Sequence, residues 1–199
     1  MNHSNREPLD SPAHSLEAMS HCIMLIRHAE KPSGGFVGVG EAGAADPRSL
    51  SVAGWRRAGA LTRYFATAAV CTNGPIRRPR HILAASPSGE HPSTRPTDTV
   101  RSLADVLALT VDQRWSDQTS VHELARAVLS MDGPVLICWR HEQLPALARA
   151  LLRDGRIPRA WPADRFDVTW ALFSSGDIWH FEQVPQCLLA GDVDQANTV

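Results

Sequence analysis

The sequence has almost no net charge, few cysteines and no long apolar run. Its 199 residues carry a formal net charge of −1, so no overall positive field draws the chain to nucleic acid or to an anionic membrane. The four cysteines form no CxxC pair, which predicts buried thiols in a reducing compartment. No apolar run approaches the length of a membrane span, and the first twenty residues lack the apolar core of a signal peptide. These absences predict a cytoplasmic protein without nucleic-acid or membrane partners.

The composition is that of an ordinary globular domain. Hydrophobic residues make up 43% of the chain and charged residues 21%, which excludes an intrinsically disordered chain. A chain of this length forms one sizeable core more readily than two. We therefore expect a flexible N-terminal tail over residues 1–20 and a single domain over residues 21–199.

Short apolar runs alternate with helical patterns along the chain. Each run is bounded by polar or Pro- and Gly-rich segments, which is typical of buried strands, and the segments between them show helical spacing. This alternation predicts a three-layer α/β/α fold with a largely parallel central sheet. Strands are expected at residues 23–26, 81–86, near 109–112 and 134–139; helices after Ser51, from about Arg95, after Ser120 and at 144–152; and a closing hairpin at 167–173 and 177–184.

The first apolar run ends in two basic side chains. The segment CIMLIRHAEKP (residues 22–32) places Arg27 and His28 at the carboxyl end of a buried strand, where α/β sheets bind their ligands. Arg95 and His141 follow later strands, and parallel strands bring these ends to one rim. Two guanidinium groups and two imidazoles would then converge. Because guanidinium groups match phosphate oxygens in a bidentate way, the set predicts a phosphate site.

Five segments together resemble the histidine phosphatase superfamily, which has the phosphoglycerate mutase-like fold. LIRHAEKP resembles its Arg-His signature, and ICWRHEQLPALARAL resembles its strand, second histidine and helix. SLSVAGWRRAGALTRYF and ASPSGEHPSTRPTDTV are similar to its first helix and second-arginine loop, and FEQVPQCLLAGD is similar to the C-termini of one bacterial branch. The resemblance covers roughly residues 22–190. It implies a metal-independent phosphatase without a cofactor, acting on a small phosphorylated substrate or a phosphoprotein.

The resemblance also implies roles for individual residues. His28 would be the nucleophile that forms a phosphohistidine, and Arg27, Arg95 and a protonated His141 would hold the phosphate oxygens. From their position just past His28, Lys31 and Ser33 would reach the phosphate or the leaving group, although polar side chains on an exposed segment would be expected there as well. This scheme is physically sound, because the pocket must neutralise an anionic ester before an uncharged imidazole can approach phosphorus.

The general acid is the least defined part of the sequence pattern. Glu142 directly follows His141, and one branch of the superfamily has an acid there, although a carboxylate in the first turn of a helix also complements the helix dipole. Glu123 is an alternative, yet its SVHE context has the spacing of a capping box. Glu90 and Asp117 are further candidates in loops. Arg140 is predicted to point away from His141 by strand alternation, and so to lie outside the pocket.

Two other functions are compatible with the same residues. A phosphoglycerate-type mutase would need a site that excludes water and retains a second phosphorylated compound. A module that binds a phosphorylated ligand without turnover would keep the pocket and lack the acid. Activity on an aryl phosphate separates an enzyme from such a module, because an aryl leaving group needs little protonation.

Overall fold

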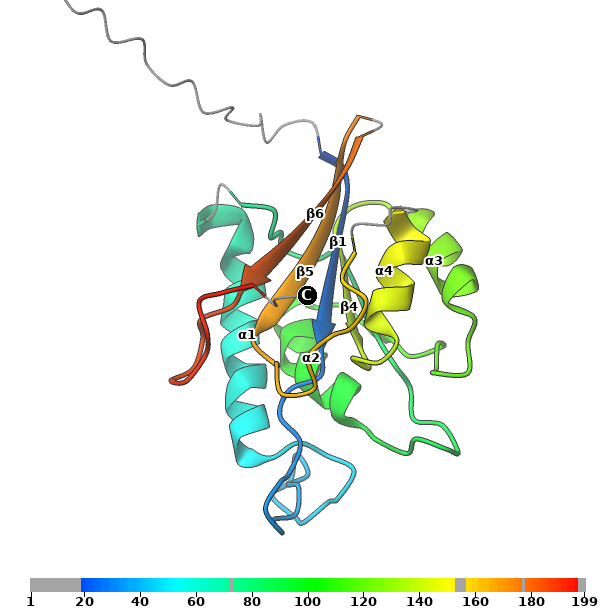
Figure 1. Ribbon diagram of the computed structural model, residues 1–199. Helices are drawn as coiled ribbons and strands as arrows, with labels where there is room; N and C mark the ends of the chain where they lie inside the picture. Colours follow the sequence, from blue (N-terminus) through cyan, green and yellow to red (C-terminus); the bar gives the residue numbers. More distant parts are fainter. Residues whose placement is uncertain (1–18, 72–73, 153–156, 177, 197–199) are drawn as a thin grey trace, which may run out of the picture.

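The computed structural model describes residues 19–71, 74–152, 157–176 and 178–196. It contains a six-stranded sheet with helices on both faces (Figure 1). The strands are β1 (Met19–Arg27), β2 (His81–Ala84), β3 (Val111–Asp112), β4 (Val135–Trp139), β5 (Val168–Ser175) and β6 (Ile178–Pro185). The helices are α1 (Val52–Cys71), α2 (Arg95–Leu107), α3 (Val121–Leu129) and α4 (Leu144–Leu152). Of the tail expected at residues 1–20, residues 1–18 lie outside the described ranges, and the last two already belong to β1.

The sheet order is β3-β2-β4-β1-β5-β6. The strands from β3 to β1 are parallel to one another, whereas β5 runs antiparallel to β1 and pairs with β6 as an antiparallel hairpin. The predicted three-layer fold, its largely parallel sheet and its closing hairpin are therefore confirmed.

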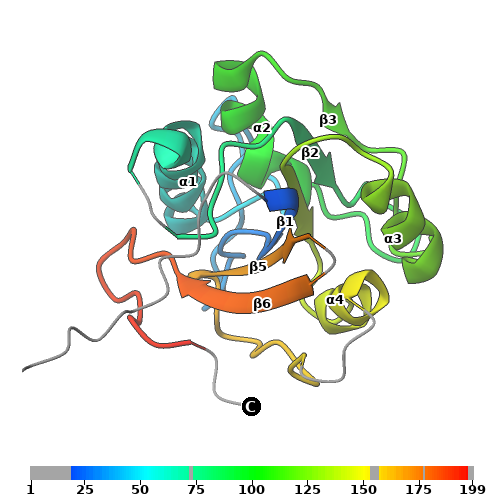
Figure 2. The ribbon, with the colours of Figure 1, turned by 90° about the horizontal axis from the view of Figure 1, so that it is seen from above.

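Successive side chains of β1 pack into two separate hydrophobic cores. Ile23 and Leu25 pack with residues of α3 and α4, while Met24 and Ile26 pack with residues of α1 and α2. Seen from above, the two pairs of helices lie on opposite faces of the sheet (Figure 2). A strand buried on both faces must be apolar at every position. This requirement explains the uninterrupted apolar run that precedes Arg27.

The pairing of β1 with β4 brings two predicted site segments together. Arg27 lies opposite Trp139 in the parallel register, and the His28 N–H donates to the Trp139 carbonyl at 3.3 Å. Both strands end at this point. The residues that follow them, including His141, therefore emerge at the same edge of the sheet.

The first turn of α1 fixes the backbone just after His28. The Ser51 hydroxyl caps the helix by accepting from the Gly54 N–H at 3.0 Å, and it donates to the Glu30 carbonyl at 3.1 Å. A Cβ atom at Gly54 would lie 2.5 Å from that same carbonyl oxygen. Glycine is therefore required for this close approach of the helix.

The cysteines only partly match the prediction. Cys22 and Cys138 are buried, as predicted, and burial raises the pKa of both thiols, that of Cys22 to about 12. Cys187 is exposed, so the prediction is wrong there, because this residue lies beyond β6 in the C-terminal segment. The side chain of Cys71 lies outside the described part. No helix among the described ranges combines the length and the apolar character needed to cross a bilayer.

Candidate active site

Most of the predicted site residues line a small hollow at the carboxyl ends of β1 and β4. Its volume is about 150 Å³, well below the 300–1,000 Å³ typical of pockets that enclose a whole small molecule. The hollow therefore has room for a small group such as a phosphoryl group, with the rest of a ligand outside it. Of the residues predicted from the sequence, it is lined by Arg27, His28, Lys31, Arg95, His141 and Glu142.

The lining of this hollow is strongly cationic. Three arginines and one lysine contribute to it, and Glu142 is the one carboxylate among its lining residues. A concave site lined by one sign of charge attracts ligands of the opposite sign. The local site therefore suits an anion, although the whole chain carries a net charge of only −1.

His28 is held as a neutral imidazole. Its Nδ1 atom lies 2.7 Å from the Ala29 carbonyl oxygen, so Nδ1 carries the proton and Nε2 keeps its lone pair. The pKa of His28 is lowered to about 3, mainly by burial and also by the charges of Arg27, Arg95 and the nearby His141, while the hydrogen bond to Ala29 opposes this shift. The ring is therefore uncharged at neutral pH, as attack on phosphorus requires.

Thr99 connects the segment that follows β1 to Arg95. The Ala29 N–H donates to the Thr99 hydroxyl oxygen at 2.9 Å, and this hydroxyl donates to the Arg95 carbonyl at 2.7 Å. Thr99 is fully buried. The end of β1 and the first turn of α2 are thus held in a fixed relation by one side chain.

Arg27 is a buried cation that the protein only partly satisfies. Its guanidinium lies 3.9 Å from the centre of the Phe166 ring, and its Nη1 donates to the Ala163 carbonyl. Its Nε atom is buried and has no hydrogen-bond partner within the described chain. Burial lowers the pKa of Arg27 to about 10, so the group stays positively charged at neutral pH.

Arg95 is fixed by the long loop that follows the first strand. Its Nε donates to the Ser49 carbonyl at 3.0 Å, and its Nη2 donates to the Pro47 carbonyl at 2.7 Å. These bonds leave the Nη1 amino group as the donor for a ligand in the hollow. The loop segment that contains Pro47 and Ser49 therefore orients an arginine of the site.

His141 and Glu142 form a contact pair at the rim. His141 Nδ1 lies 3.1 Å from a carboxylate oxygen of Glu142, whose side chain is 67% exposed. Burial lowers the pKa of His141, and the charges of Arg27 and Lys31 act in the same direction, whereas Glu142 opposes them. The protonated His141 expected from the sequence therefore stays a prediction about the phosphate-bound site. The two negative charges of a bound phosphate would favour its protonation.

The prediction that Arg140 lies outside the pocket is wrong. Arg140 lines the hollow, and its positive charge contributes to lowering the pKa of Arg95. Strand alternation fails here because β4 ends at Trp139. The Arg140 carbonyl already accepts hydrogen bonds from Gln143 and Leu144 in the turn that starts α4. Its side chain direction is therefore set by a turn and not by the strand.

The remaining predicted residues lie apart from the hollow. Ser33 does not line it, and its carbonyl accepts the Phe36 N–H in a turn of the long loop. Glu90 and Glu123 are exposed and do not line it either. The capping box predicted around Glu123 is not formed, because Ser120 makes no side-chain cap bond.

Sequence reasoning missed His91, which also lines the hollow. Its ring contacts Asp117, with 3.4 Å between His91 Nε2 and a carboxylate oxygen. Both residues lie in irregular loops, where no periodicity or motif spacing could have paired them. Asp117 therefore contacts a lining residue of the hollow, His91, although Asp117 does not line the hollow itself.

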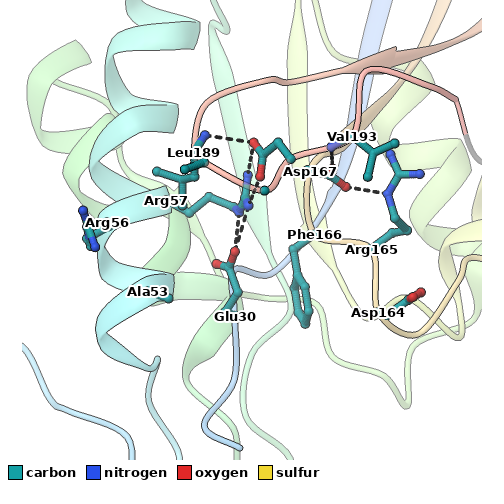
Figure 3. A pocket seen from close by; sticks show the side chains of 13 residues that line it. Glu30, Ala53, Arg56, Arg57, Asp164, Arg165, Phe166, Asp167, Leu189 and Val193 are labelled. Atoms are coloured by element: carbon teal, nitrogen blue, oxygen red, sulfur yellow. Dashed lines mark hydrogen bonds and ion pairs between the residues drawn. The ribbon is translucent and has the colours of Figure 1, made fainter.

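A larger hollow of about 570 Å³ lies next to the site and includes Phe166 in its lining (Figure 3). Its charged groups largely satisfy one another: Arg57 pairs with Glu30 at 2.8 Å and with Asp192 at 2.6 Å. Asp167 pairs with Arg165 at 2.6 Å and accepts the Val193 N–H at 2.8 Å. These contacts hold the C-terminal segment against α1 and the end of β1. The smaller hollow, with its cations not matched by carboxylates, is the better candidate for an anion site.

No group of three or more His, Cys, Asp or Glu side chains in the described ranges is arranged to hold a metal ion. The positive groups that line the hollow are three arginines and Lys31.

Comparison with known proteins gives a match in structure only. No protein-family model matches the sequence, and no curated protein matches it. Among solved structures, the protein histidine phosphatase SixA complexed with tungstate superposes with a TM-score of 0.55 at 14% identity, covering 83% of this chain and 97% of that one. Mycobacterial hydrolase 2 superposes with a TM-score of 0.51 at 15% identity, covering 91% of this chain and 93% of that one. The ecdysone phosphate phosphatase from Bombix mori, also with tungstate, gives 0.50 at 11% identity, covering 90% and 98%.

These similarities extend over nearly the full length of the solved structures. The chain therefore has the phosphoglycerate mutase-like fold of the histidine phosphatases, as the sequence resemblance implied. At such low identity the similarity defines the fold, and the chemistry must be argued from the residues of the site.

Proposed function

We propose that this chain is a phosphatase that hydrolyses a phosphate monoester or a phosphoprotein through a phosphohistidine on His28. The observation that carries the proposal is the geometry of His28: a neutral imidazole with its Nδ1 bonded to Ala29 and its ring among cations. An uncharged nucleophile surrounded by positive charge is the combination that attack on an anionic phosphate needs.

In the first step His28 Nε2 attacks phosphorus as the bond to the leaving oxygen breaks. Arg27, Arg95 and Arg140 carry the positive charge that stabilises the phosphoryl oxygens in the transition state. His141 takes up a proton when the dianionic group arrives, and Glu142 at its Nδ1 stabilises the resulting cation. Since these side chains neutralise the anion, the step requires no metal ion.

In the second step water attacks the phosphohistidine and releases inorganic phosphate. The small volume of the hollow supports this assignment, because only the phosphoryl group fits and the leaving group lies in solvent. After the first product leaves, water reaches the phosphohistidine directly. A mutase would instead need to retain its phosphorylated product near His28.

The test is hydrolysis of p-nitrophenyl phosphate by the purified chain, compared with His28→Ala and repeated with a metal chelator. We expect activity in the wild type, no change with chelator and no activity in the variant. Phosphate binding without turnover would contradict the proposal and identify a binding module. A panel of phosphorylated metabolites together with a phosphohistidine peptide then defines the substrate class, since one structural neighbour is titled a protein histidine phosphatase.

A further inference from the structure

His91 lies on the segment of residues 85–94 that connects β2 to α2, and its backbone is pinned to the rim of the site. The His91 N–H donates to the Ser88 carbonyl at 3.2 Å, and the His91 carbonyl accepts from the Ser88 N–H at 3.0 Å. The same carbonyl accepts from Arg140 Nη2 at 3.1 Å. This backbone anchoring holds a ring that lines the hollow and whose side chain is still 51% exposed. A group in this position can contact both the phosphoryl site and a leaving group outside it.

Asp117 contacts His91 from the protein side. One of its carboxylate oxygens lies 3.4 Å from His91 Nε2, and its side chain is only 8% exposed. The other oxygen, Oδ1, is buried and has no hydrogen-bond partner in the described part of the chain. A buried carboxylate at one ring nitrogen fixes the orientation of an imidazole and stabilises its cationic form. The opposite nitrogen, Nδ1, is then the one that can carry a proton to a ligand.

From this arrangement we propose that His91 is the proton donor to the leaving group and that Asp117 is its positioning residue. The inference rests on the proposed function and adds the acid that the mechanism needs. Glu142, the acid favoured by the sequence pattern, contacts His141 Nδ1 instead. This contact directs the Glu142 carboxylate to the His141 ring and not to a departing oxygen.

His91 gives up one proton in the first step and regains one in the second. In the first, the phosphorus–oxygen bond of the ester breaks, the bond from phosphorus to His28 Nε2 forms, and cationic His91 gives its Nδ1 proton to the departing oxygen. In the second, neutral His91 takes a proton from the attacking water, the phosphorus–nitrogen bond breaks, and inorganic phosphate leaves. His91 is cationic again at the end, and the net reaction is ester plus water to alcohol plus phosphate.

The experiment compares two leaving groups. The kcat/KM values for p-nitrophenyl phosphate and for glycerol 2-phosphate are measured for the wild type, His91→Gln, Asp117→Asn and the control His122→Gln. His122 is an exposed histidine at the start of α3 that does not line the hollow. A general acid contributes roughly 10²–10⁴-fold, so we expect His91→Gln to lose about 10²-fold or more on the alkyl ester and far less on the aryl ester. Asp117→Asn should lower the alkyl-to-aryl ratio in the same direction, and the control should leave it unchanged.

A second measurement shows that the variant is folded. His91→Gln should still form the phosphohistidine from p-nitrophenyl phosphate, because this leaving group departs without a proton. Equal loss on both esters, no loss on either, or failure to form the phosphohistidine would each overturn the assignment of His91. A wild type without activity on the aryl ester would instead contradict the proposed function, and with it this inference.

Discussion

The Nδ1 atom of His28 donates its proton to the carbonyl oxygen of Ala29, the residue that follows it, over 2.7 Å. Ala29 is itself held by Thr99, which accepts its N–H at 2.9 Å. The tautomer of His28 is therefore fixed by the backbone and does not depend on a carboxylate partner. Several consequences of this geometry can be measured.

The covalent step is the first of them. Brief incubation with a ³²P-labelled phosphate ester, followed by denaturation, should leave label on the protein that is labile to acid and stable to base, as a phosphoramidate is. His28→Ala should remove this label, because it removes the nitrogen that forms the bond. His122→Ala, on an exposed helical turn, serves as the control and should keep it. Label of the same stability in His28→Ala would show that another residue is the nucleophile.

Arg95 should contribute to catalysis through transition-state charge. Arg95→Ala is expected to lower kcat/KM by at least about 10²-fold, by analogy with the loss of one oxyanion donor, and to weaken inhibition by vanadate. Circular dichroism and thermal unfolding should show an intact fold. Arg126→Ala, an exposed arginine on α3, is the matched control. If Arg95→Ala keeps full activity and vanadate affinity, the guanidinium serves only to hold the carbonyls of Pro47 and Ser49.

The regular elements of this fold could be predicted because their sequence patterns are strong. The run from Cys22 to Ile26 in β1 is apolar at every position, which is typical of a strand buried on both faces, and the apolar spacing from Trp55 to Ala68 in α1 has one helical interpretation. Parallel pairing then brings Arg27 and His141 to one rim whatever the details of the loops. The core of the site therefore follows from topology.

Residues in turns and loops could not be placed in the same way. The direction predicted for the Arg140 side chain relies on the alternation of side chains along a strand, but β4 ends one residue earlier, at Trp139. The pairing of His91 with Asp117 joins two irregular segments whose relative position depends on tertiary packing alone. For the same reason Ser33, close to His28 in sequence, turns away into the long loop. Sequence proximity is a weak guide once the chain leaves regular structure.

Arg140 should act as a third arginine of the phosphate pocket. Its Nε is buried without a partner in the described residues, while its Nη2 donates to the His91 carbonyl. Arg140→Ala should raise the inhibition constant for vanadate and lower kcat/KM on the aryl ester, whose leaving group departs without a proton from His91. The loss is expected on the order of 10²-fold. Arg126→Ala again provides the control. Unchanged vanadate binding in Arg140→Ala would limit this residue to anchoring the loop.

The low pKa of His28 makes a prediction about stability and pH. Its folded pKa is about 3 against an ordinary value of 6.5, so between these values the unfolded chain binds a proton that the folded chain does not. Stability should therefore fall as the pH drops from about 6.5 towards 3. The His28→Asn variant should not show this part of the loss. Between pH 7 and pH 4 the free energy of unfolding should therefore fall by on the order of 1–3 kcal/mol more in the wild type than in the variant. Urea unfolding of both proteins at the two pH values measures it. Parallel losses in both would contradict a neutral buried His28.

The Glu142→Gln variant distinguishes the two candidate acids, Glu142 and His91. Its carboxylate raises the pKa of His141, whose burial and cationic neighbours lower it. Glu142→Gln should therefore weaken the charge that His141 offers to the phosphoryl oxygens, and slow p-nitrophenyl phosphate and glycerol 2-phosphate by the same factor. A true acid would behave otherwise, because protonation matters in proportion to how poor the leaving group is. A loss confined to the alkyl ester in Glu142→Gln would make Glu142 the proton donor. His91 would then lose its assigned role, and Asp117 would lose its role in positioning it.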